Sequence, residues 1–134
     1  MSVIVDTSVW SLFLRHKGRT ETEVILLRKL IREQRVQMLG IIRQELLSGI
    51  RELARFEKLE RVLDGFPSLL ATEQDHTVAA QCFNTCRSKG IQGSSVDFLI
   101  CAQALNHHLS IVTTDKDFLS YAQHLPIQLH QENV

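Results

Sequence analysis

The feature that most constrains this chain is a short apolar run at its N-terminus that ends in a carboxylate. Val3, Ile4 and Val5 are followed at once by Asp6. A run rich in β-branched residues is typical of a buried strand in a sheet covered on both faces. Such a strand would deliver Asp6 to the C-terminal edge of the sheet, where open α/β folds bind their ligands. The alternative is that Asp6 only caps the helix that follows it.

The rest of the chain alternates short apolar runs with longer helical patterns. Further strands are predicted at residues 36–39, 69–71 and 109–113, with an edge strand at 127–129. Helices are predicted at residues 9–14, 20–35, 41–48, 51–63, 73–88, 96–105 and 118–123. This alternation implies parallel pairing, so we expect a three-layer α/β/α sandwich with a mostly parallel sheet, formed by residues 1–134 as one domain.

Composition excludes some classes of function. The chain has 15 basic and 15 acidic residues, so nucleic acid could be bound only through a local basic patch. No apolar run approaches the ~20 residues that span a bilayer, and no basic segment precedes the first apolar run. We therefore expect a cytoplasmic protein without a membrane partner. Cys82, Cys86 and Cys101 lie in apolar helical patterns and are predicted to be reduced core thiols.

Glu45 lies in the helical pattern of residues 41–48, between Ile41 and Ile42 on the helical wheel. A carboxylate inside this apolar arc is costly to bury unless another group compensates its charge. The alternative is a residue at the boundary of the apolar face whose carboxylate reaches water. The pattern alone leaves these two interpretations equally open.

Asp97 and Asp115 lie at a predicted helix start and after a predicted strand. Asp97 follows Ser94 with capping-box spacing, which would explain it as an ordinary first-turn residue. Its helix is apolar almost all round, however, so a carboxylate on the side of Ile100 would point toward the core. Asp115 follows the 109–113 strand as Asp6 follows the first strand. Asp117 could itself cap the next helix.

Asp6, Glu45, Asp97 and Asp115 could therefore converge at one end of the sheet. Like charges a few ångströms apart raise one another's pKa or repel the site open unless a cation relieves them. Ligands that are all oxygen favour Mg²⁺ or Mn²⁺ over zinc. Such a site suits phosphoryl chemistry, in which the metal activates a water and stabilises charge on the phosphate.

Four segments, taken in order, resemble the PIN domain, and more narrowly the VapC-type toxins of bacterial toxin–antitoxin pairs. They are IVDTSVW at 4–10, QELLSG at 44–49, SVDFLICA at 95–102 and TTDKDF at 113–118. The resemblance covers nearly the whole chain. It implies a parallel-sheet α/β/α fold and an endoribonuclease that depends on Mg²⁺ or Mn²⁺. It also implies that water attacks the phosphodiester and leaves 5′-phosphate and 3′-hydroxyl ends.

The resemblance further implies roles for individual residues and partners. Asp6, Glu45, Asp97 and Asp115 match the acidic catalytic set, with Asp6, Asp97 and Asp115 as metal ligands. Asp117 matches a further acidic position of many members, and Ser8 and Thr113 match places where the family often has a hydroxyl near the metal. Members of the toxin branch usually dimerise and are held inactive by a cognate antitoxin. We therefore expect a homodimer with a VapB-type antitoxin as partner and RNA as substrate.

Basic residues at helical spacing are the candidates for RNA binding. Arg51, Arg55 and Lys58 fall on one stripe, and Arg15, Lys17 and Arg19 are a second choice. Acidic residues lie between them, so a solvated surface is the other explanation for either cluster. The same acids would also serve a metal-dependent phosphatase or DNA nuclease. A catalytically silent PIN-like module that binds RNA or protein is the alternative outside enzymes.

Overall fold

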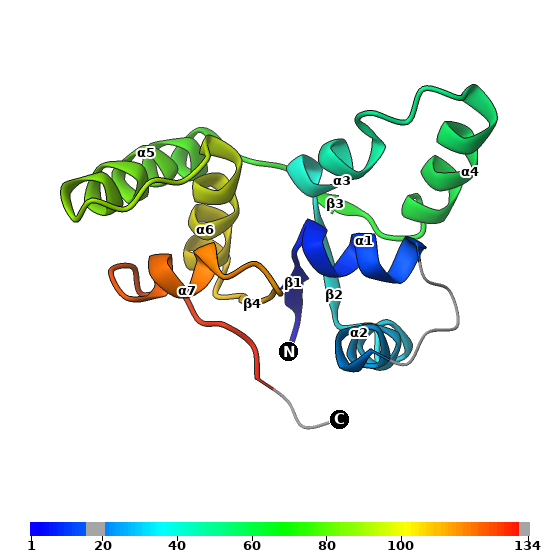
Figure 1. The fold of residues 1–134 in the computed structure, drawn as a ribbon, viewed down its shortest axis with the longest axis horizontal. Helices are drawn as coiled ribbons and strands as arrows, with labels where there is room; N and C mark the ends of the chain where they lie inside the picture. The colour runs from blue at the N-terminus through cyan, green and yellow to red at the C-terminus, as the bar shows by residue number, and fades with distance from the viewer. Residues whose placement is uncertain (16–20, 132–134) are drawn as a thin grey trace.

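The computed structural model describes residues 1–15 and 21–131 (Figure 1). At its centre four parallel strands lie in the order β3-β2-β1-β4. Their bounds are β1 (Val3–Val5), β2 (Val36–Leu39), β3 (Ser68–Leu69) and β4 (Ser110–Val112). Ile4 pairs with Gln37 on one side and with Ile111 on the other, so β1 lies between β2 and β4.

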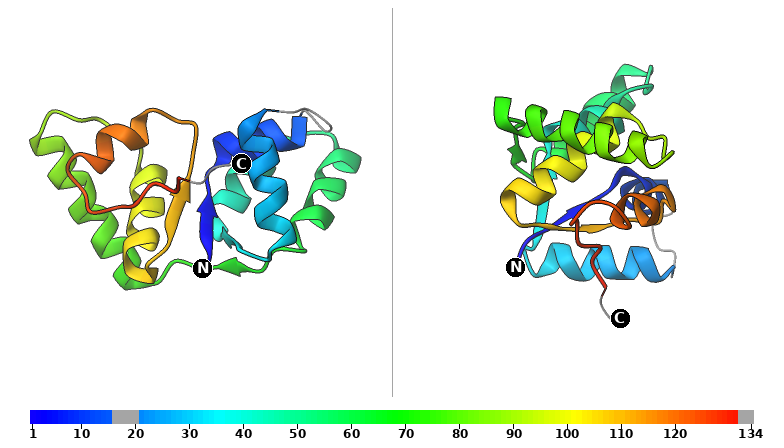
Figure 2. Two further views of the ribbon diagram at one scale, coloured as in Figure 1. Left: turned by 90° about the horizontal axis from the view of Figure 1, so that it is seen from below. Right: turned by 90° about the vertical axis from the view of Figure 1, so that its left-hand side faces the viewer.

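Helices cover both faces of the sheet. They are α1 (Thr7–Arg15), α2 (Thr22–Arg32), α3 (Gly40–Leu47), α4 (Leu53–Leu63), α5 (Glu73–Ser88), α6 (Ser95–His107) and α7 (Asp117–Ala122). In the left view of Figure 2, α1 to α4 lie on one side of the sheet and α5 to α7 on the other. The expected three-layer α/β/α arrangement with a parallel sheet is confirmed.

The core is built from the two elements that the sequence predicts to be most apolar. All three residues of β1 are buried, as expected for a central parallel strand. Helix α6 buries seven consecutive residues, from Phe98 to Ala104, because it packs between the sheet and α5. The three cysteines are free and buried. Among the described residues, no helix is long and apolar enough to cross a membrane.

Two predicted elements differ from the structure. Gly49 has a φ of 87°, and the chain turns there between the two helices predicted at 41–48 and 51–63. Helix α4 begins at Leu53, so Arg51 precedes it and the predicted basic stripe keeps only Arg55 and Lys58. The predicted edge strand at 127–129 is reduced to one isolated parallel bridge between Ile111 and Leu129.

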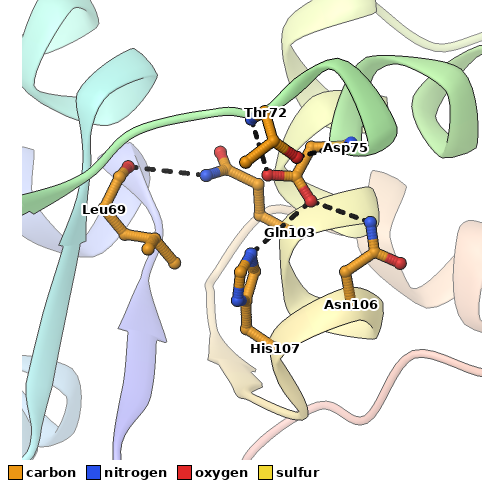
Figure 3. Close-up of polar contacts among 6 residues, drawn as sticks. All are labelled: Leu69, Thr72, Asp75, Gln103, Asn106 and His107. Atoms are coloured by element: carbon orange, nitrogen blue, oxygen red, sulfur yellow. Dashed lines mark hydrogen bonds and ion pairs between the residues drawn. The ribbon is translucent and has the colours of Figure 1, made fainter.

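A buried carboxylate ties α5 to the C-terminal end of α6 (Figure 3). Asp75 accepts hydrogen bonds from the Thr72 N–H at 2.9 Å and from Asn106 Nδ2 at 2.8 Å, and His107 Nε2 lies 3.5 Å away. Beside it, Gln103 Nε2 donates to the Leu69 carbonyl across 3.4 Å. Burial alone would raise the pKa of Asp75, but the hydrogen bonds from Asn106, Thr72 and His107 outweigh it and lower this pKa.

Candidate active site

Strand β1 places Asp6 at the C-terminal edge of the sheet. The Asp6 N–H donates to the Val112 carbonyl across 2.8 Å, which extends the pairing of β1 with β4 by one residue. Its carboxylate is buried, and Oδ2 accepts hydrogen bonds from Ser8 Oγ at 2.9 Å and Thr113 Oγ1 at 2.8 Å. The side chain is therefore held by hydroxyls from two elements, while its main-chain carbonyl accepts from the Val9 N–H in the first turn of α1.

Ser8 and Thr113 join the ends of β1 and β4. Thr113 Oγ1 donates to Asp6 and accepts from the Asp115 N–H across 2.9 Å. Ser8 Oγ accepts in turn from the Thr114 N–H across 3.1 Å. These short bonds fix the loop after β4, so that Asp115 stays next to Asp6.

Three carboxylates gather on this loop and the helices beside it. Asp97 lies in the first turn of α6, Asp115 in the loop after β4, and Asp117 at the start of α7. One carboxylate oxygen from each lies within 4.8 Å of the others. Asp115 Oδ1 accepts from the N–H of Asp117, the first residue of α7, across 2.9 Å, although the sequence pattern offered Asp117 itself as the cap.

The pKa of Asp97 is raised above its ordinary value. Burial raises its pKa, and the charges of Asp6 and Asp115 raise it further, although hydrogen bonds from Tyr121 and Ser94 act in the opposite direction. The Tyr121 hydroxyl donates to Asp97 Oδ2 across 2.7 Å. Burial is the largest cause of the raised pKa, and the neighbouring carboxylate charges add to it.

The residues present fit a hard divalent cation. The group of Asp97, Asp115 and Asp117 offers only carboxylate oxygens, which favour Mg²⁺ or Mn²⁺ over softer ions. A cation among them would relieve the repulsion that raises the pKa of Asp97. The set differs from the prediction in one respect, because Asp117 joins the group within 4.8 Å and Asp6 lies beside it.

Glu45 lies outside this group. Its side chain is exposed, and the apolar face of α3 does not bury it. Glu45 is therefore a residue at the boundary of that face, the second of the two predicted interpretations. Oε1 accepts a hydrogen bond from Thr7 Oγ1 across 2.8 Å. Because Thr7 follows Asp6 directly, this bond holds Glu45 close to the end of β1.

A groove runs from Glu45 between α1, α3 and α4, which lie together on one side of the sheet in Figure 1. Its volume is about 1140 Å³. Apolar side chains such as Phe13 and Leu59 line it, together with the basic residues Arg15, Arg55 and Lys58. Arg51 is not among the lining residues, and Lys17 and Arg19 lie outside the described residues. Three candidates for RNA binding therefore face the same hollow as Glu45.

Sequence reasoning missed Thr7 and Tyr121, both of which bond to carboxylates of the site. A role for Thr7 could have been predicted, because it lies between Asp6 and Ser8 in the segment IVDTSVW. Tyr121 gave no signal, because an aromatic residue in a short apolar helix is typical of a core position. Its hydroxyl contact depends on how α7 packs against α6.

The chain is similar to one protein family and to individual proteins along most of its length. The family model described as PIN domain matches residues 3–123. The VapC ribonuclease Mb1587 of Mycobacterium bovis is 33% identical over 120 residues, which cover 87% of this chain and 88% of that protein. Ribonuclease VapC11 of Mycobacterium tuberculosis matches with the same identity and coverage.

Solved structures show the same fold. VapBC2 from Rickettsia felis, bound to a DNA fragment from its promoter, superposes with a TM-score of 0.77 at 16% identity, covering 99% of this chain and 100% of that one. DNA-bound VapBC from Salmonella typhimurium gives a TM-score of 0.77 at 20% identity, with 97% of each chain covered. At these identities the likeness concerns the fold.

Proposed function

Because the chain belongs to the PIN domain family and is related throughout most of its length to VapC proteins, we propose that it is the toxin of a type II toxin–antitoxin pair and a metal-dependent endoribonuclease. The observation that carries this proposal is the gathering of Asp97, Asp115 and Asp117 within 4.8 Å, beside the buried Asp6. The names of the VapC ribonucleases support RNA as the substrate.

The carboxylates fall into three roles in the proposed reaction. Asp97, Asp115 and Asp117 would hold the cation, and Asp6, which the Ser8 and Thr113 hydroxyls keep in one orientation, would complete the site. Bound Mg²⁺ or Mn²⁺ would supply Lewis-acid stabilisation of the phosphate and an acidified water. Glu45, exposed at the groove and held by the Thr7 hydroxyl, would orient the attacking water and accept its proton. Attack by water leaves a 5′-phosphate and a 3′-hydroxyl.

The groove between α1, α3 and α4 is the proposed path of the RNA. Arg15, Arg55 and Lys58 would neutralise backbone phosphates there, although the chain as a whole has no net charge. Glu45 and Thr7, which follows Asp6 directly, line the same groove, so an RNA that follows the basic residues would come to Glu45. A local patch of this kind is what a neutral nuclease requires.

We also propose a VapB-type antitoxin as partner and a homodimer as the assembly, working on RNA in the cytoplasm. The likeness to solved structures of VapBC complexes supports the antitoxin partner, and the homodimer follows only from the family resemblance. The test is expression of the chain in bacteria. Native protein should arrest growth, whereas Asp97→Asn should not, and co-expression of a cognate VapB-type antitoxin should restore growth. Normal growth with abundant, folded native protein would contradict the toxin role.

A further inference from the structure

Tyr121 is the only tyrosine of the chain, and α7 buries it completely against α6. Its ring centroid lies 4.9 Å from that of Phe98 and 5.2 Å from that of Phe118. The hydroxyl emerges from this aromatic packing at one point, where it donates to Asp97 Oδ2 across 2.7 Å. The only phenol of the molecule is therefore aimed at a carboxylate of the candidate metal centre.

Gly93 keeps the phenol in this position from the other side. A Cβ atom at residue 93 would lie 2.6 Å from the Tyr121 hydroxyl oxygen and 2.7 Å from Cζ of Phe98. Both distances are shorter than real Cβ contacts, so any side chain here would displace the phenol or the loop. With the ring held by two aromatic neighbours and its oxygen covered by Gly93, the hydroxyl has no room to swing away from Asp97.

Two other carboxylates of the site, Asp6 and Asp115, have donors of their own. Ser8 and Thr113 donate to Asp6, and the Asp117 N–H donates to Asp115. For Asp97, which is half-buried in the first turn of α6, this task falls to Tyr121. A carboxylate turns about its Cβ–Cγ bond unless a donor engages one oxygen, and donors that orient a metal ligand in this way raise its affinity for the metal.

We propose that Tyr121 is a positioning residue: its hydroxyl fixes the carboxylate of Asp97 so that this residue can bind a divalent cation together with Asp115 and Asp117. Gly93 is required because it leaves space for the phenol. The inference rests on the proposed function, since it concerns the cation which that function requires. It adds a residue that acts only through Asp97 and contacts neither RNA nor the cation.

The first test is Mn²⁺ affinity, measured by the electron paramagnetic resonance signal of free Mn²⁺ during titration. Tyr121→Phe keeps the ring and removes only the hydroxyl, so we expect binding about 10–100-fold weaker than in native protein. The matched control is Phe83→Leu, which removes part of the aromatic packing on Phe98 and leaves the hydroxyl in place. Affinity in Tyr121→Phe within about twofold of the native value would overturn the proposal.

Gly93→Ala should also weaken Mn²⁺ binding in the native background, because the new Cβ displaces the phenol. In a Tyr121→Phe background the further loss of affinity should be smaller, because no hydroxyl is left to displace and only the close contact with Phe98 remains. Equal losses from Gly93→Ala in the two backgrounds would show that residue 93 acts independently of the hydroxyl, which contradicts the proposal.

A second measurement leaves the Tyr121 hydroxyl and Gly93 in place. Protein grown with 3-fluorotyrosine carries one fluorine-bearing residue, so its ¹⁹F spectrum reports on Tyr121 alone. Saturating Mg²⁺ should shift this resonance, and the shift should be absent in Asp115→Asn. A resonance unmoved by Mg²⁺, in protein that calorimetry shows to bind Mg²⁺, would overturn the role of Tyr121 while leaving the proposed function in place. Native protein that binds neither ion would contradict both.

Discussion

Thr7 Oγ1 donates a hydrogen bond to Oε1 of Glu45 across 2.8 Å, although the two residues are 38 positions apart in the chain. Thr7 begins α1 directly after Asp6, and Glu45 lies on α3. This bond connects the exposed carboxylate of Glu45 to the end of β1, where the buried carboxylate of Asp6 lies. The acids of the site therefore have two proposed roles. Asp97, Asp115 and Asp117 are suited to holding a cation, and Glu45 is suited to acting on water.

Glu45→Gln tests this division. Gln has nearly the same size and helix propensity and still offers an oxygen to Thr7, so the free energy of unfolding in EDTA should change by less than ~0.5 kcal/mol. Cleavage of RNA should fall by about 100-fold or more, since a positioned base is removed. Denaturant unfolding and cleavage rates measure the two effects. Glu57→Gln on α4 is the control, and equal cleavage by native protein and Glu45→Gln would remove Glu45 from the mechanism.

Asp115→Asn tests the carboxylate group. Asn keeps an Oδ1 acceptor for the Asp117 N–H, so the start of α7 is preserved. One negative charge beside Asp97 is removed, so the protein in EDTA should be at least as stable as native protein. The stabilisation by Mn²⁺ should shrink by about 1.4 kcal/mol for each tenfold loss of affinity. Thermal melting with EDTA and with Mn²⁺ measures both.

Asp64→Asn is the matched control for that experiment. Asp64 forms an exposed ion pair with Arg43 across 2.9 Å, outside the carboxylate group. Its substitution should leave the Mn²⁺-induced shift in melting temperature unchanged. A shift in Asp115→Asn as large as that of native protein would show that Asp115 does not bind the ion.

The fold and the positions of Asp6 and Asp115 after strands could be predicted because their signals are local. The run from Val3 to Val5 that ends in Asp6 predicts a central strand and the edge at which it stops, and β1 has those bounds. The same logic placed Asp115 beyond β4. Helix α5 begins and ends where its pattern predicts, at Glu73 and Ser88. In each case the bounds of the element follow from the spacing of its apolar residues and from the residues at its ends.

The remaining features depend on packing between distant segments, which a sequence pattern does not contain. The pattern around Glu45 fitted a buried and an exposed carboxylate equally well, and only the turn at Gly49 and the position of α3 make it exposed. Asp75 has the pattern of an ordinary first-turn residue, and its burial depends on Asn106 and His107, about 30 residues later. Tyr121 reaches Asp97 through the packing of α7 on α6.

Arg55→Ala and Lys58→Ala should weaken RNA binding, because both side chains line the groove. For a single-stranded probe, the slope of log affinity against log salt should become shallower by about 0.7 for each phosphate that the variant no longer neutralises. Fluorescence anisotropy of a labelled RNA in EDTA measures this without cleavage. Arg61→Ala on the same helix and Arg51→Ala before it are controls, since neither residue lines the groove. Equal weakening in all four variants would indicate general charge attraction.

Asp75→Asn should destabilise the protein by about 1–3 kcal/mol at neutral pH, because it disturbs a buried charged hydrogen-bond network. The pKa of Asp75 in the folded protein is lower than the ordinary value of 3.8. A group with a depressed pKa stabilises the fold above its unfolded pKa, and this contribution disappears as pH falls through the folded pKa. The stability difference between native protein and Asp75→Asn should therefore be constant at neutral pH and shrink below about pH 4.

Denaturant unfolding across this pH range measures the effect. Glu73→Gln, in the same first turn of α5 and exposed, is the control and should show no such pH dependence. Mn²⁺ affinity should be unchanged in Asp75→Asn, because the network lies at the opposite end of α6 from Asp97. A difference that grows as the pH falls would contradict the assignment.

The most direct test of the central claim is the chemistry of the RNA ends that purified protein produces with Mg²⁺ or Mn²⁺. Metal-activated water, positioned by the carboxylates, predicts 5′-phosphate and 3′-hydroxyl ends. Cleavage should stop in EDTA and in folded Asp97→Asn. Fragments that end in a 2′,3′-cyclic phosphate, or cleavage that persists in EDTA, would contradict the account.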